Sequence, residues 1–92
     1  MELVVFGYQI EPGRDEPLAF AGSYEECQRE ALSEREELRR NNPDIDPLGA
    51  MAIYRFTLAW PDNDRLLSVL NEKTSLLDVI VFDRRLVGLV AN

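Results

Sequence analysis

Residues 51–60 read MAIYRFTLAW, and their side chains sort into two alternating sets. A period of two is typical of a β-strand, in which alternate residues share one face. One face is predicted to carry Ala52, Tyr54, Phe56, Leu58 and Trp60, and the other Met51, Ile53, Arg55, Thr57 and Ala59. The pattern favours a strand that packs on one side, as in an antiparallel sheet.

The N-terminal half predicts two strands and a helix around this central strand. Residues 3–10 form an almost continuous apolar run, which indicates a strand. Residues 17–21 predict a short edge strand, because Pro17 at its start cannot donate to a ladder. A helix is predicted from Tyr24, where Ser23 and Glu26 have the spacing of a capping box, and it ends before Pro43.

The C-terminal part predicts a short helix and two further strands. Asp62 is the expected N-cap of a helix that runs to about residue 72. The apolar runs 77–82 and 86–90 flank the charged residues 83–85, and this arrangement predicts a β-hairpin.

The predicted fold class is therefore α+β, with the element order β-(β)-α-β-α-β-β. We expect a two-layer sandwich in which two helices cover one face of a four- to five-stranded mixed or antiparallel sheet. A ferredoxin-like fold is the second choice, because it requires two strands between the helices. Residues 1–92 are predicted to form a single domain, as is usual for a chain of this length.

The residue types that are absent exclude several kinds of chemistry. The chain has no histidine and one cysteine, so histidine-dependent triads and ordinary zinc sites are excluded. Asn42, Asp44 and Asp46 have the spacing of calcium ligands, but Pro47 and Ile53 occupy positions where the motif needs glycine and glutamate. We expect no enzyme, and hence no catalytic residue, no metal and no cofactor.

The net charge of −7 is unevenly distributed along the chain. Residues 1–50 hold twelve acids and five arginines, so the whole excess lies in this half. Such a field repels phosphate and attracts basic proteins, so nucleic acid is not an expected partner. The chain shows no basic leader and no apolar run of membrane-spanning length, and its cysteine is single. We therefore expect no membrane partner and a cytoplasmic location.

Surplus apolar strand surface supplies the main functional expectation. The C-terminal third and residues 3–10 carry apolar side chains on both pleat faces, which two helices cannot cover. We therefore expect a small non-enzymatic protein-interaction or regulatory module, of unknown process, that self-associates. The expected contact is a homodimer through the open sheet face or the C-terminal strand.

Two alternatives stay open. The chain could be an acidic, nucleic-acid-mimicking inhibitor of a basic protein, acting through the glutamates of its long helix. It could instead be a small-ligand binder or enzyme with a site around Arg55 and Asp78, joined by Tyr54 and Trp60. Asp78 lies within an apolar run, where an unpaired buried carboxylate is costly.

Overall fold

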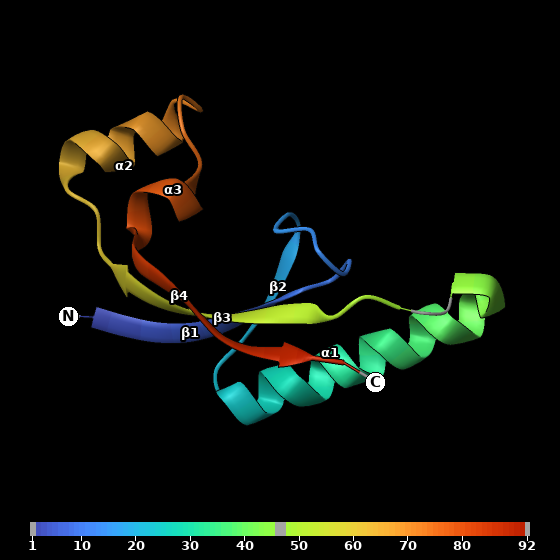
Figure 1. Ribbon diagram of the computed structural model, residues 1–92. Coiled ribbons are helices and arrows are strands. Elements are labelled where there is room, and N and C mark those ends of the chain that lie inside the picture. The colour runs from blue at the N-terminus through green and yellow to red at the C-terminus, as the bar shows by residue number, and fades with distance from the viewer. Residues whose placement is uncertain (1, 46–47, 92) are drawn as a thin grey trace.

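A four-stranded antiparallel sheet forms the centre of the computed structural model, which describes residues 2–45 and 48–91 (Figure 1). The strands have the spatial order β2-β1-β3-β4. They are β1 (Glu2–Gln9), β2 (Leu18–Ala21), β3 (Met51–Ala59) and β4 (Val81–Val90). The predicted α+β class is confirmed, with the sheet wholly antiparallel.

Three α-helices and a 3₁₀ turn complete the described chain. The helices are α1 (Tyr24–Asn41), α2 (Asn63–Leu70) and α3 (Leu76–Ile80), and the turn η1 is Pro43–Ile45. Both predicted N-caps are confirmed: Ser23 Oγ accepts from the Glu26 amide at 3.2 Å, and Asp62 Oδ1 accepts from the Arg65 amide at 2.8 Å.

The predicted C-terminal hairpin is wrong, because residues 76–80 form α3 and β4 runs without a turn through residues 83–85. The Ser75 hydroxyl accepts from the Asp78 amide at 3.2 Å and starts a helical turn inside the apolar run. This local cap outweighs the β-propensity of the run. The charged residues need no turn, because β4 is an edge strand and their side chains can reach solvent.

The strand register divides the sheet into two faces, because directly opposed residues point to the same side. One side, here called the α1 face, carries Tyr8 opposite Ile53 and packs against α1. The other, here called the α3 face, carries Leu3 opposite Leu58, and both line a pocket with Leu76 of α3. α1 therefore lies on one side of the sheet and α3 on the other, with α2 beyond α3 (Figure 1). This differs in detail from the expected placement of both helices on one face.

The core is small and lies mostly between α1 and the sheet. Cys27 and Ala31 of α1 pack there with Tyr8, Met51 and Ile53. β3 is buried on both faces, however, since Ile53 and the oppositely directed Phe56 are both inaccessible. The prediction that this strand packs on one side is wrong, because β3 is central and each face has its own cover.

Arg35 is a buried residue of α1 that the sequence analysis did not identify. The residue is 1% exposed, and its guanidinium donates to the carbonyls of Gly49 at 2.6 Å and Leu48 at 3.3 Å. Burial, and to a smaller extent the nearby Arg39, lowers the pKa of this guanidinium. The side chain thus ties the second half of α1 to the segment that enters β3.

Replacing Arg35 by alanine is expected to lower the free energy of unfolding by about 3 kcal/mol, because two carbonyls lose a charged donor. Urea denaturation followed by circular dichroism measures this loss. The control is Arg29→Ala, an exposed position of the same helix, with an expected change within about 0.5 kcal/mol. Equal losses in the two variants would contradict a structural role for Arg35.

Candidate functional site

The loop between β1 and β2 is held against the α3 face by the side chain of Gln9. The Gln9 Oε1 atom accepts from the Ala52 amide at 2.8 Å and from the Gly13 amide at 3.1 Å. Its Nε2 atom donates to Asp15 Oδ1 at 2.8 Å. One buried amide group therefore joins β1, β3 and the loop, and it fixes the position of Asp15.

Asp15 is the centre of a polar cluster with Tyr54 and Arg84. The Tyr54 hydroxyl donates to Asp15 Oδ1 at 2.8 Å, and the Arg84 guanidinium lies 3.8 Å from Asp15 Oδ2. The same guanidinium stacks on the Tyr54 ring at 4.7 Å from its centroid. The hydrogen bond from Tyr54, then that from Gln9, holds the pKa of Asp15 below its ordinary value. The same bond raises the pKa of Tyr54.

Tyr54→Phe is expected to raise the pKa of Asp15 toward its ordinary value of about 4, because the strongest donor to the carboxylate is lost. A depressed folded-state pKa contributes stability above the unfolded value and loses it as the pH falls through the folded value. The variant should therefore lose part of its stability at neutral pH and little in acid. Carboxyl NMR titration measures the shift. An unchanged Asp15 midpoint would contradict the assignment, and Tyr24→Phe is the control.

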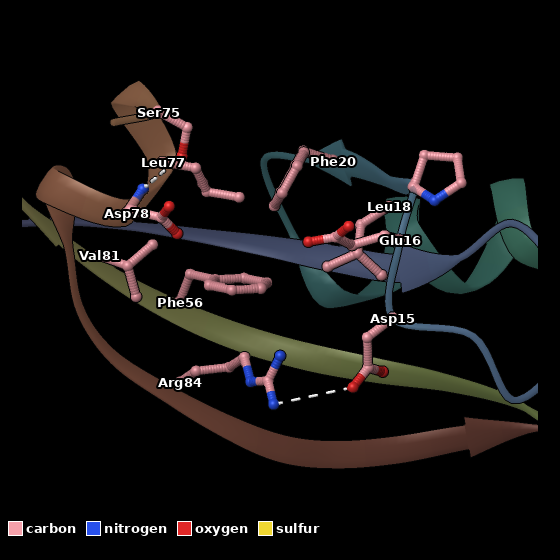
Figure 2. Close-up of a pocket in the computed structure, with 11 residues that line it drawn as sticks. Asp15, Glu16, Leu18, Phe20, Phe56, Ser75, Leu77, Asp78, Val81 and Arg84 are labelled. Carbon is pink, nitrogen blue, oxygen red and sulfur yellow. Dashed lines mark hydrogen bonds and ion pairs between the residues drawn. The ribbon is translucent and has the colours of Figure 1, made fainter. Parts of the chain in front are cut away.

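A groove of about 870 Å³ remains on the α3 face between this loop and α3. Asp15, Glu16 and Leu18 border it on the loop side, and Ser75, Leu77 and Asp78 border it on the α3 side. Phe20, Phe56 and Arg84 lie between the two walls (Figure 2). The groove therefore combines an aromatic floor with three carboxylates and one guanidinium at its rim.

Gly7 explains how the two rings of the groove floor can lie close to β1. It lies on the α3 face opposite both Phe20 and Tyr54. A Cβ atom there would come within 2.9 Å of the Phe20 ring and 3.0 Å of the Phe56 ring. The missing side chain lets these rings pack edge to face, with centroids 5.3 Å apart, close to the strand. A larger residue would force the rings outward into the groove.

The structure does not bring Arg55 and Asp78 together. Arg55 lies on the α1 face beside Thr57, with 3.4 Å from Nη1 to Oγ1, near the ion pair between Asp83 and Arg85. Asp78 is exposed in the first turn of α3 and lines the groove on the opposite face. The predicted site around these two residues is therefore divided between two separate surfaces.

Tyr54 and Trp60 also lie apart from each other. Tyr54 belongs to the Asp15 cluster at one end of the groove. Trp60 follows β3 at the other end of the sheet, is 80% exposed and lines an apolar pocket of about 260 Å³ with Leu3 and Leu76. The sequence analysis missed Asp15 and Phe20 as groove residues, because nothing in their local pattern distinguishes them from ordinary turn and strand residues.

The glutamate-rich side of α1 is exposed, as the nucleic-acid-mimic alternative requires. Glu30 and Glu37 are on this surface, but so are Arg29 and Arg40, and Arg40 lies 3.6 Å from Glu36. The negative charge of the helix is therefore interrupted by positive groups.

The described residues contain no group of three or more histidine, cysteine or acidic side chains that could hold a metal ion. Asp46 of the calcium-like spacing lies outside the described part of the chain. Cys27 is completely buried, and desolvation, with Glu30 and Glu26 adding to it, raises the pKa of its thiol to about 11.

Cys27 is expected to react with a thiol reagent at pH 8 far more slowly in the native protein than in concentrated urea, because the native thiol is buried and protonated. Absorbance during the reaction with a chromogenic disulfide measures both rates. The raised pKa of the Cys27 thiol also contributes to the free energy of unfolding. This contribution is fully present below about pH 8.5 and falls as the pH rises toward 11. Similar rates in buffer and urea would contradict the burial.

The outer edge of β4 is a second exposed surface. β4 pairs with β3 on one side and is the last strand of the described sheet. Leu86, Val87 and Leu89 are 60%, 40% and 63% exposed, and these three residues are called the β4 edge below. An edge strand with exposed aliphatic side chains is a template for pairing with another chain.

Comparison of the chain with protein-family models, with curated proteins and with solved structures finds no match. Within the described residues, none of the helices combines the length and the apolar character needed to cross a membrane.

Proposed function

We propose that the protein is a small non-enzymatic interaction module that forms a homodimer through the C-terminal half of β4. The observation that carries this proposal is an edge strand of ten residues whose last half exposes the aliphatic side chains of the β4 edge. A second β-strand would satisfy the outward backbone groups and cover these side chains together.

The chain is more extended than a compact domain of its length, and its excess surface is large enough for such a contact. The radius of gyration is 15.3 Å, whereas a compact domain of 92 residues has about 12 Å. The accessible surface is 6409 Å², about 1,000 Å² more than the roughly 5,400 Å² of a typical monomer of 10.5 kDa. This surplus is comparable with the roughly 800 Å² that each partner buries in a standard interface.

Charge and register favour a contact through residues 86–90. Asp83, Arg84 and Arg85 place charges in the first half of β4, where they disfavour an incoming strand. Leu86 and Leu89 both point to the α3 face, opposite Tyr54 and Ala52. An antiparallel pairing about a two-fold axis then brings Leu86 of each copy against Leu89 of the other. The reducing cytoplasm is the compartment in which we expect this dimer, since the chain has a single cysteine.

The double variant Leu86→Lys/Leu89→Lys is expected to be monomeric at tens of micromolar, where the unaltered protein is a dimer. Two buried ammonium groups on each copy would repel one another and lose their hydration. Size-exclusion chromatography with light scattering measures the mass against the 10.5 kDa of one chain.

Leu70→Lys is the matched control, because Leu70 of α2 is 69% exposed but lies outside the β4 edge. This variant should remain dimeric. A monomeric unaltered protein, or equal loss of dimer in the control, would refute the proposed interface.

A further inference from the structure

We propose that the groove on the α3 face binds a basic amphipathic peptide segment of a partner protein. The segment would place one bulky apolar side chain on the Phe20–Phe56 floor and lysine or arginine side chains toward the two walls. This proposal goes beyond self-association and does not depend on it, because none of the three residues of the β4 edge lines the groove.

The aromatic floor of the groove favours binding of an apolar side chain, here called the apolar anchor. Phe20 is 42% exposed, and Leu18, Leu77 and Val81 surround the two rings with further aliphatic surface. Gly7 keeps the rings close to the strand, so the space above them stays free for a side chain. Burial of an aromatic or branched aliphatic group against such a floor is a main source of affinity at peptide sites.

The carboxylates at the rim favour a ligand with positively charged side chains. Glu16 stands on the loop side and Asp78 on the α3 side, with the floor between them (Figure 2). No hydrogen bond or ion pair to another described residue occupies either side-chain carboxylate. The one guanidinium of the groove, from Arg84, is already paired with Asp15 and stacked on Tyr54. Two free carboxylates therefore face any ligand that reaches the floor.

Charge also decides against other occupants of the groove. A second copy of this chain carries the same net charge of −7, so it would add negative charge to an acidic rim. Phosphate-bearing ligands meet the same repulsion. A lysine- or arginine-rich segment is attracted both by the rim and by the field of the whole molecule, which accelerates its association.

Fluorescence anisotropy with three labelled peptides of equal length tests the proposal on the intact protein. The first contains lysines around a central Phe-Leu pair, the second has alanines in place of that pair, and the third has glutamates in place of the lysines. We expect the first to bind most tightly and the second at least about tenfold more weakly, since it loses the apolar anchor. The third should not bind. Affinity for the first peptide should fall as salt rises.

The variant Glu16→Gln/Asp78→Asn should weaken binding of the first peptide about tenfold or more, because it removes both free carboxylates. The matched control Glu30→Gln/Glu37→Gln removes two charges from α1, outside the groove, and should change the affinity little. Circular dichroism verifies that both variants fold, and all four positions are exposed.

Equal affinity of the groove variant and the unaltered protein would overturn the proposal, as would a larger loss in the α1 control. Equal binding of the anchored and alanine peptides would also overturn it, since the floor would then contribute nothing. The Leu86→Lys/Leu89→Lys variant separates the two proposals. It should still bind the first peptide in preference to the alanine peptide, whether or not the unaltered protein is a dimer.

Discussion

Each face of the sheet is covered over only part of its length, and the covered parts of the two faces do not coincide. This staggered cover is the constraint from which the rest of the molecule follows. α1 shields the α1 face from about Phe6 to the end of β4, while the loop of residues 11–17 and α3 shield the opposite face at its two ends. β3 is central enough to be buried on both sides, whereas β4 has a neighbour on one side only. The same constraint produces a small core, a groove and an exposed edge.

Hydrogen bonds from polar side chains connect segments that apolar contacts would hold together in a larger core. Gln9 satisfies two backbone amides and positions Asp15, and Arg35 satisfies two carbonyls before β3. A chain of this size buries a modest share of its surface, so each satisfied buried group has a large relative effect on stability. These contacts also hold in place the loop that forms one wall of the groove.

The groove and the β4 edge are independent outcomes of the same staggered cover. The groove is the part of the α3 face that neither the loop nor α3 reaches, and its rim is acidic because Glu16 and Asp78 end up on facing walls. The second half of strand β4 is uncharged, and there Leu86, Val87 and Leu89 of the β4 edge are exposed to solvent. An acidic rim favours a basic peptide, whereas an aliphatic strand edge favours another strand, so the two surfaces suit different partners.

The sequence by itself determined the elements whose signals are local. The period of two over residues 51–60 specified β3, and the hydroxyl of Ser23 and the carboxylate of Asp62 specified where α1 and α2 begin. The same kind of signal was present at Ser75, but the apolar run after it resembles a strand, so periodicity alone could not identify α3. Arg35 lay at a stripe position of α1, four residues after Ala31, but its charge concealed its burial.

Only the tertiary structure decided what the faces of the sheet meet. The register placed Arg55 on the α1 face, and the packing of α3 placed Asp78 on the opposite face. Folding also brought Asp15, Tyr54 and Arg84 together from three separate segments. No local pattern encodes such neighbours, because strand order and the side on which a helix packs depend on contacts between residues distant in the chain. The close packing of the groove floor against β1 likewise depends on Gly7 lying below two phenylalanines of other strands, which becomes visible only once those strands are paired.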